Sequence, residues 1–307
     1  MHPILIRIGD FFIGSYGVMA ALGILAGVFT AAWRARRAGI DENIILDLGF
    51  FGILIGMLGA RLTYILVNFP SFLQAPMDYI LTRQGFVFAG GMIVGCLAAI
   101  YYLRRKGAPV WTVFDCIAPS VPLGHAFGRI GCFLAGCCWG KRCDLPWAVA
   151  FPAVSDPKGN PMGFVHQDHL EHGWIPFGAE RSLPVHPVQL YEAAALFLFF
   201  GVLSWLWRRR RFDGHLVAAY MLMYGAARFG LEFLRGDSSR GALGALSTSQ
   251  WISLAAMVCG AVIWLWRRTL PMVELPLAKG ERRGAETEAG EEPLATPRPR
   301  HKRKAPR

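Results

Sequence analysis

Four ionisable side chains lie within or at the ends of strongly apolar stretches of this 307-residue chain. They are Arg129, Glu192, Arg228 and Glu232. Because a charge at membrane depth is costly, such a side chain normally faces a cavity, a partner or an anionic ligand. Arg129 lies in the glycine-rich segment 124–140, and glycine-broken helices are tolerated in a membrane where they line a cavity. The four residues are therefore candidates for a buried site.

Structural explanations remain open for three of these residues. Arg129 can belong to a helix-packing face of small residues and extend its side chain to the membrane interface. Arg228 and Glu232 are four residues apart and can form an ion pair on one helical face. The sequence alone therefore leaves both structural and functional roles open for these residues.

Two histidines are candidates for proton transfer. His125 precedes Arg129 by four residues, so on a helix both side chains share one face. The neighbouring guanidinium favours the neutral imidazole, which can accept a proton. The alternative is a hydrogen bond from His125 to a backbone carbonyl exposed by the broken helix. His186, at the start of the apolar run 188–207, is the second candidate.

The composition sets the class of protein that must position these side chains. Hydrophobic residues make up 54% of the chain and charged residues 17%, and the mean hydropathy is +0.36. These values predict an all-α polytopic integral membrane protein. The first ten residues lack the pattern of a cleavable signal, so we expect the first apolar run to remain in the protein.

About seven apolar runs approach the length of about 20 residues that a membrane-spanning helix needs. The run at 110–136 contains Pro119 and Pro122, so we expect it to bend or split. The runs are 14–33, 46–67, 86–103, 110–136, 188–207, 216–234 and 250–266.

Basic residues follow every second run, which predicts the orientation of the chain. The N-terminus is expected outside and the C-terminus in the cytoplasm, with residues 139–187 forming a small extracytoplasmic head. We divide the chain into a membrane domain, 1–268, and a disordered basic tail, 269–307. The net charge of +11 is a signal of topology and of contact with anionic membrane lipids, and it does not indicate nucleic-acid binding.

Cysteines and histidines give little indication of a metal site. Cys96, Cys116 and Cys259 lie in apolar runs and are expected in the core. The spacing of Cys132, Cys137, Cys138 and Cys143 is not that of C-x-x-C motifs, so no metal site is predicted. A disulfide involving Cys143 fits an oxidising face. The histidine-rich segment 166–172 is interpreted as a solvated loop.

A set of short motifs, in order along residues 10 to 268, resembles the prolipoprotein diacylglyceryl transferases, membrane enzymes of bacterial lipoprotein maturation. The central match is Gly128-Arg129-Ile130-Gly131 followed by Phe133 and Gly136. The other matches are Tyr16-Gly17, Gly59-Ala60-Arg61, Gly85 to Gly91, Asp115, His186 to Glu192, Tyr224 to Arg228, Glu232 and Arg235.

This resemblance implies transfer of a diacylglyceryl group from phosphatidylglycerol to the lipobox cysteine of a prolipoprotein signal peptide. A thioether forms and glycerol phosphate is released, without cofactor or metal. By resemblance, Arg129 holds the lipid phosphate and Arg228 adds positive charge beside the leaving group, with Glu192, His125 and His186 as further catalytic candidates. The residues expected to support substrate binding are Tyr16, Arg61, Gly90, Gly91, Asp115, Tyr224 and Glu232.

Three positions depart from the family pattern. Many members carry histidine at the position of Ala89, asparagine at Cys132 and glutamate at Cys137. The change at Ala89 matters most, because that histidine is a leading candidate for the general base. The competing interpretation is a divergent member, or a membrane thiol-redox or lipid-binding protein without transferase activity.

Overall fold

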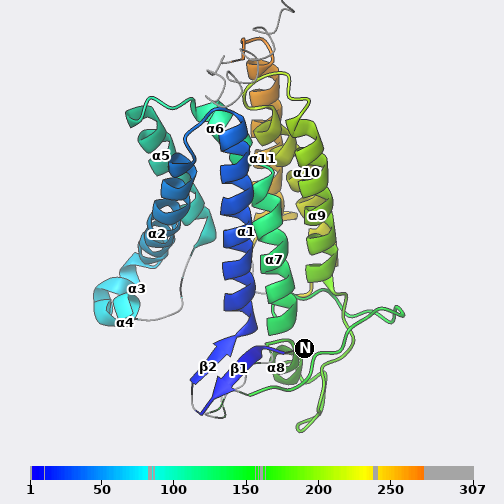
Figure 1. Ribbon diagram of the computed structural model, residues 1–307. Helices are drawn as coiled ribbons and strands as arrows, with labels where there is room; N and C mark the ends of the chain where they lie inside the picture. The colour runs from blue at the N-terminus through cyan, green and yellow to red at the C-terminus, as the bar shows by residue number, and fades with distance from the viewer. Residues whose placement is uncertain are drawn as a thin grey trace, which may run out of the picture.

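The computed structural model describes residues 2–9, 11–81, 85, 87–155, 157, 159, 162, 164–237 and 241–272, and within them the chain is mostly helical (Figure 1). Among these described residues, four helices are long and apolar enough to cross a membrane. They are α1 (Ser15–Arg37), α2 (Glu42–Val67), α9 (Val188–Trp207) and α11 (Thr248–Arg267). The expectation of a disordered tail falls, from residue 273 on, outside the described residues.

Three further apolar helices are shorter. They are α5 (Phe88–Arg105), α7 (Ser120–Ala135) and α10 (His215–Leu231). The predicted run 110–136 splits as expected: α6 (Val110–Ile117) ends just before Pro119, and α7 begins after it. The ring of a proline inside a helix removes a backbone hydrogen bond and collides with the preceding turn, which explains the break.

Local sequence explains where several of these helices begin and end. Asp41 accepts a hydrogen bond from the backbone N–H of Asn43 and caps α2. Ser247 and Gln250 form a reciprocal capping box at the start of α11. At its other end α7 stops at Gly136, whose φ of 72° is left-handed and favours glycine.

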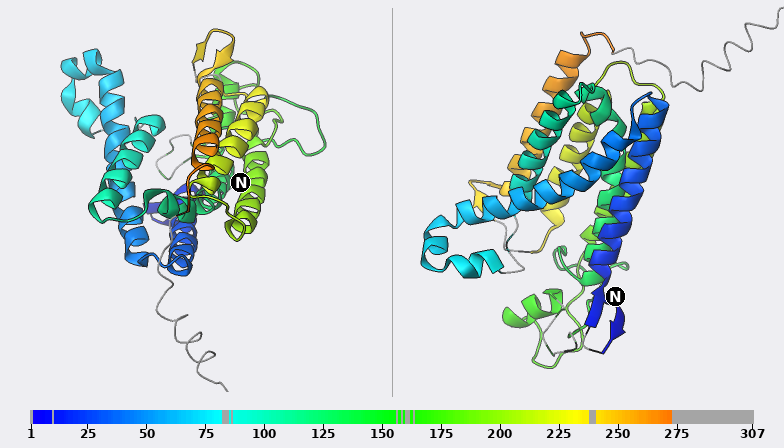
Figure 2. Two further views of the ribbon diagram at one scale, coloured as in Figure 1. Left: turned by 90° about the horizontal axis from the view of Figure 1, so that it is seen from above. Right: turned by 60° about the vertical axis from the view of Figure 1, so that its left-hand side comes forward.

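The helices pack as one bundle with a more peripheral pair. α7 packs against both α1 and α9, and α10 packs against α9 and α11. α2 and α5 pack on each other and extend to one side of the bundle (Figures 1 and 2). A Cβ added at Gly23 of α1 would lie 2.6 Å from the carbonyl oxygen of Gly124 in α7, so only glycine permits this backbone approach.

Small β-hairpins correct the expectation of an all-α chain. β1 (Ile4–Ile8) pairs antiparallel with β2 (Phe11–Gly14) ahead of α1. The isoleucine-rich stretch before Gly9 carries the signal, since β-branched residues followed by a turn favour a hairpin. A second, shorter hairpin joins β3 (Ala242–Leu243) and β4 (Leu246–Ser247). The remaining short elements are α3 (Phe69–Gln74), α4 (Pro76–Leu81), α8 (Phe164–Glu171) and η1 (Glu232–Leu234).

The described residues between 139 and 187 lie beside β1 and β2 at one end of the bundle (Figure 1). Their own core is formed by Trp139, Phe151, Val165 and Val185. The histidine-rich segment is largely the helix α8, so the solvated-loop interpretation was wrong. A helix forms there because Val165 and His169, four residues apart, are both buried on its inner side.

The cysteines outside the glycine-rich segment correct two expectations. Cys116 is buried as predicted, but Cys96 and Cys259 are exposed on the surfaces of α5 and α11. An apolar run does not distinguish side chains that pack inside the protein from side chains on the outer surface of a membrane helix. The prediction for Cys96 and Cys259 was therefore wrong. Cys143 is a free thiol, so the predicted disulfide does not form.

Candidate active site

A buried ion pair joins α7 to α9. Nε of Arg129 lies 3.0 Å from Oε2 of Glu192, whose side chain is 2% exposed. The same Nε donates a hydrogen bond of 3.2 Å to Nε2 of His125, one helical turn earlier on α7. Nε2 of His125 is 3.7 Å from Oε1 of Glu192. The predicted shared face of His125 and Arg129 is therefore present, and Glu192 completes it from the neighbouring helix.

The helix α10 contributes Tyr224 to the same group. Its hydroxyl donates to Oε1 of Glu192 at 3.1 Å, and its ring meets the His125 ring edge to face at 5.4 Å between centroids. Oε1 of Glu192 thus accepts a hydrogen bond, and Oε2 has the ion pair with Arg129 and no hydrogen bond among the described residues. A buried carboxylate is retained only when it is paired and hydrogen-bonded, and this carboxylate meets both conditions.

The arrangement leaves the two terminal nitrogens of Arg129 available to bind a ligand. Its Nε is held by Glu192 and His125, while its two terminal nitrogens have no partner among the described residues. Because an N–H of Arg129 donates to Nε2 of His125, the neutral imidazole carries its proton on Nδ1. An oriented guanidinium with free terminal donors can receive the two oxygens of a carboxylate or phosphate.

Arg228 and Glu232 form the ion pair that their spacing allowed. Nη1 of Arg228 is 2.6 Å from Oε2 of Glu232, and both side chains are largely buried. Nη2 of Arg228 donates to the hydroxyl of Ser249 at 3.1 Å. Arg228 follows Tyr224 by one turn of α10, so this pair extends the polar group toward α11.

Other predicted site residues lie apart from this group. Asp115 accepts hydrogen bonds from the backbone N–H groups of Gly214, Leu216 and Val217 and so caps the start of α10. This end of the bundle is opposite to the hairpin of β1 and β2 (Figure 1). The structure therefore shows a capping role for Asp115, and its support of a substrate stays a prediction.

Arg61, Gly90 and Gly91 serve the packing around α2 and α5. The guanidinium of Arg61 donates to the carbonyl oxygens of Gly85 and Ile80 at 3.1 and 3.3 Å, and to that of Tyr79. A Cβ at Gly91 would lie 2.6 Å from the carbonyl oxygen of Gly56. Gly90 faces Thr63 at similarly short range. These glycines set how closely the two helices approach.

Tyr16 and His186 border the group at the end nearer the hairpin. Tyr16 is half exposed on α1 and packs against Gly131, two residues beyond Arg129. Nδ1 of His186 lies 3.4 Å from the hydroxyl of Tyr191, and its Cβ approaches Gly140. His186 has no contact with the Arg129–Glu192 pair among the interactions of the described residues.

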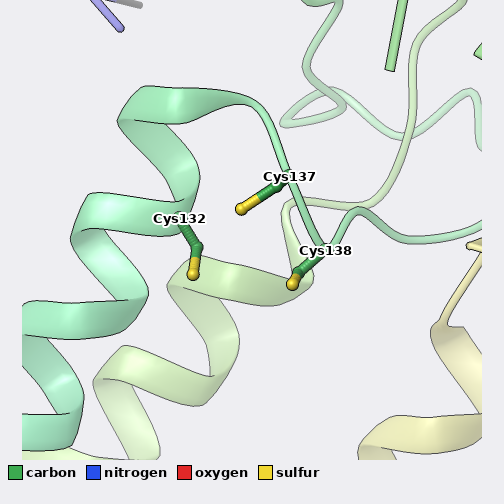
Figure 3. A group of neighbouring side chains, drawn as sticks. All are labelled: Cys132, Cys137 and Cys138. Atoms are coloured by element: carbon green, nitrogen blue, oxygen red, sulfur yellow. The ribbon is translucent and has the colours of Figure 1, made fainter. Parts of the chain in front are cut away.

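Several residues to which the sequence analysis gave no role in the site support this region. Gln189, three residues before Glu192, donates to the carbonyl oxygen of Cys137 at 2.7 Å. Arg235 forms a bidentate ion pair with Asp237. The thiols of Cys132, Cys137 and Cys138 come together just beyond α7 (Figure 3). The sequence signals were the family motifs that contain Gln189 and Arg235 and the position of the three cysteines within the glycine-rich segment.

At the opposite end of the bundle, Arg34 is a further buried arginine, 3% exposed. It donates to the hydroxyls of Ser120 and Ser204 at 3.0 and 2.9 Å and to the carbonyl oxygen of Thr30. Its position among other basic residues had suggested only a role in topology. Here it ties α1 to α7 and α9.

Comparison with known proteins gives one consistent result. The family described as prolipoprotein diacylglyceryl transferase matches residues 3–266. A phosphatidylglycerol–prolipoprotein diacylglyceryl transferase of Clostridium tetani is 36% identical over 264 residues, which are 86% of this chain and 97% of that relative. Enzymes of the same name from Synechococcus elongatus and Bordetella parapertussis are 30% and 33% identical, covering 92% and 88% of this chain and 94% and 97% of their own lengths.

Proposed function

The chain belongs to the prolipoprotein diacylglyceryl transferase family, and we propose that its Arg129–Glu192 pair is the centre of that activity. The chain is a transferase that moves the diacylglyceryl group of phosphatidylglycerol to the cysteine thiol of a prolipoprotein. The sulfur attacks the glyceryl carbon that carries the phosphate. A C–S bond forms, the C–O bond breaks with its electrons on the leaving glycerol phosphate, and the thiol proton passes to a base.

Arg129 is the proposed ligand of the lipid phosphate. The observation that carries this assignment is that Nε is held at 3.0 Å from Glu192 while the two terminal nitrogens are without partners in the described part of the chain. Glu192 and His125 thus fix the plane of the guanidinium before the lipid arrives. Fixed donors in a site of low dielectric stabilise the charge that develops on a departing phosphate.

Arg228 has a different proposed role. Both of its terminal nitrogens are engaged, one with Glu232 and the other with Ser249. Direct binding of phosphate would require breaking a buried ion pair, which is costly. We therefore assign Arg228 to long-range stabilisation of the leaving group, and Glu232 to holding Arg228 in place.

The thiol proton needs an acceptor, since Ala89 stands where many relatives have histidine. His125 is our candidate, because its imidazole lies next to the proposed phosphate ligand. Its Nε2 accepts the hydrogen bond from Nε of Arg129, so His125 can take the thiol proton once that N–H donates to Oε2 of Glu192 instead, with the plane of the guanidinium unchanged. His186 is the alternative base, nearer the residues that would meet an incoming signal peptide.

The same proposal fixes a topology. We infer that α5, α10 and the segment of α6 and α7 cross the bacterial inner membrane together with the four longer helices. Basic residues gather in the last turns of α1, α5 and α11, at the end of the bundle away from α8 (Figure 1). Excess Lys and Arg mark the cytoplasmic side, so residues 139–187 and the N-terminus lie outside. A lipobox cysteine then enters from the outer leaflet.

The test of this function is a direct assay. Purified protein is supplied with radiolabelled phosphatidylglycerol and a signal peptide with a lipobox cysteine, and label transferred to the peptide is counted. Transfer should depend on the peptide cysteine, because a peptide with serine there offers no thiolate. Failure of the wild-type chain to label the cysteine peptide would refute the assignment.

A further inference from the structure

Three thiols meet where α7 runs into the loop that follows it. The Sγ atoms of Cys132, Cys137 and Cys138 all lie within 4.8 Å of one another. Cys132 is buried on the last turn of α7, and the other two are half-buried on the loop (Figure 3). In the described part of the chain this is the one group of three or more metal-ligating side chains.

The backbone turns twice to bring the thiols together. Gly136 ends α7 with φ at 72°, and the N–H of Cys137 donates back to the carbonyl oxygen of Cys132 at 3.0 Å. Cys138 then adopts φ at 60°, and it is the one non-glycine residue with positive φ among the described residues. A residue other than glycine rarely adopts this backbone conformation unless its surroundings hold it there.

Neighbouring segments hold the loop on both sides of the thiols. Gln189 of α9 donates to the carbonyl oxygen of Cys137 at 2.7 Å. The N–H of Gly140 donates to the carbonyl oxygen of His186, and the N–H of Gly236 donates to that of Trp139, each at 3.1 Å. The three sulfur atoms are therefore positioned by the fold and not by flexible chain.

We propose that Cys132, Cys137 and Cys138 bind one thiophilic d10 cation, Zn²⁺ or Cu⁺. A tetrahedral site with Zn–S bonds of about 2.3 Å places its sulfur atoms about 3.8 Å apart. Each distance between two sulfur atoms therefore has to shorten by at most about 1 Å. Trigonal Cu⁺ requires a similar spacing. Water completes the coordination of Zn²⁺. A disulfide would use two of the thiols and leave the third unused in the same place.

Two guanidinium groups lie near the three thiols. Three thiolates and a divalent cation carry a net charge of −1, and with Cu⁺ the net charge is −2. The guanidinium of Arg235 contacts Cys138, and Arg129 precedes Cys132 by three residues on α7. Asp237 and Glu192 pair with these two guanidiniums, so Arg235 and Arg129 supply N–H donors near the thiolates and no surplus positive charge. The bound ion would fasten the loop to α7 beside the proposed phosphate ligand, but its binding does not depend on transferase activity.

Titration of the full-length protein with metal ions tests the proposal without an activity measurement. The protein is purified in detergent with reductant, the reductant is removed anaerobically, and Cd²⁺ is added as a spectroscopic probe. We expect one equivalent to give a thiolate-to-cadmium charge-transfer band, which Zn²⁺ and Cu⁺ then displace. The order of displacement identifies the preferred ion. Absence of a stoichiometric band would overturn the proposal.

Single substitutions locate the site. Cys132→Ser, Cys137→Ser and Cys138→Ser should each weaken binding by about tenfold or more, because loss of even an outer-shell partner has effects of that size. Cys143→Ser, in the same loop region, is the matched control and should bind as the wild type. Equal weakening by Cys143→Ser, or none from the other three, would contradict the assignment.

Alkylation of the wild-type protein avoids any doubt about the folding of variants. With Zn²⁺ or Cu⁺ bound, Cys132, Cys137 and Cys138 should be protected from a maleimide while Cys143 reacts, as read by mass spectrometry of peptides. Removal of the ion with a chelator should expose all three. A disulfide between any two of the three in protein purified without reductant would overturn the proposal.

Discussion

Nε of Arg129 and Oε2 of Glu192 lie 3.0 Å apart and connect α7 to α9 across 63 residues of sequence. The pair orients the guanidinium without occupying its terminal nitrogens. We expect Arg129→Lys to reduce turnover roughly a hundredfold, since a lost charge-assisted contact in the transition state is worth about 2 to 4 kcal/mol. An ammonium keeps the charge but loses the paired donors. The measurement is label transfer by purified protein.

Arg104→Lys is the matched control for this change, because Arg104 is exposed in the last turn of α5. It should retain wild-type turnover. Thermal unfolding of both variants separates folding from catalysis, and Arg129→Lys should unfold close to the wild type. Wild-type turnover in Arg129→Lys would remove Arg129 from the phosphate site.

Glu192→Gln should lower the stability of the protein as well as its turnover. The change leaves the buried charge of Arg129 without its counter-ion, and breaking a buried pair in this way costs about 3 to 5 kcal/mol. Glu42→Gln is the control: Glu42 pairs with Arg36 at 3.2 Å on the surface, where such a pair contributes about 0 to 1 kcal/mol. Thermal unfolding in detergent should therefore show a large loss for Glu192→Gln alone. Equal losses would argue against a buried ion pair.

The sequence predicted contacts that depend on helical spacing. The four-residue separation of His125 from Arg129 correctly predicted that the two side chains share a face, and that of Arg228 from Glu232 left open the ion pair that the structure contains. The apolar runs located the long helices to within a few residues, because the length of a run reflects the membrane's thickness.

Contacts between segments far apart in the chain could not be predicted from the sequence. The family resemblance placed Asp115 among the site residues, but nothing in the sequence showed that its carboxylate caps α10, about a hundred residues later. Arg129 and Glu192 were both singled out, but nothing local paired them. The thiol cluster depends on the left-handed turns at Gly136 and Cys138, which the spacing of cysteines does not reveal.

The proposed orientation predicts which side of the membrane residues 139–187 occupy. Phe177 is 96% exposed in this region, so Phe177→Cys in a cysteine-free background offers an accessible thiol. It should react with a membrane-impermeant maleimide added to intact spheroplasts. Arg104→Cys in the same background should react only after lysis. The reverse pattern would invert the topology.

The buried His169 makes residues 139–187 sensitive to acid. Burial, with the charge of Arg142 nearby, lowers the pKa of His169 below its usual value of about 6.5, and its Nδ1 accepts a hydrogen bond from the N–H of Leu183. A proton therefore binds more tightly to the unfolded region. The free energy of unfolding that the neutral His169 contributes is fully present above about pH 6.5. It is lost as the pH falls through the lower pKa that His169 has in the folded protein.

Hydrogen exchange of α8 peptides measures this effect. Exchange, corrected for its intrinsic pH dependence, should become faster at about pH 5 than at about pH 7.5. His169→Gln should flatten the dependence, because a glutamine side chain does not titrate. His172→Gln is the control: His172 is an exposed residue of the same segment, and its replacement should leave the dependence unchanged. Undiminished acid sensitivity in His169→Gln would assign the effect to another group.

The proposed base makes the most specific prediction. His125→Ala should abolish thioether formation while phosphatidylglycerol still binds, because Arg129 and Glu192 keep their contact at 3.0 Å. Adding Ala89→His to that variant should restore part of the rate, since it returns an imidazole to the position where many relatives carry one. The measurements are label transfer and equilibrium binding of fluorescent phosphatidylglycerol.

A second substitution distinguishes proton transfer from positioning of Arg129. His125→Gln keeps an acceptor for the Arg129 N–H but removes the titratable nitrogen. If His125 is the base, His125→Gln should be as inactive as His125→Ala, and a peptide supplied at higher pH, where its thiol is already ionised, should recover part of the rate in both variants. If His125 only orients Arg129, the glutamine variant should remain active at every pH. Full activity of His125→Ala would exclude both roles and leave His186 as the residue to test.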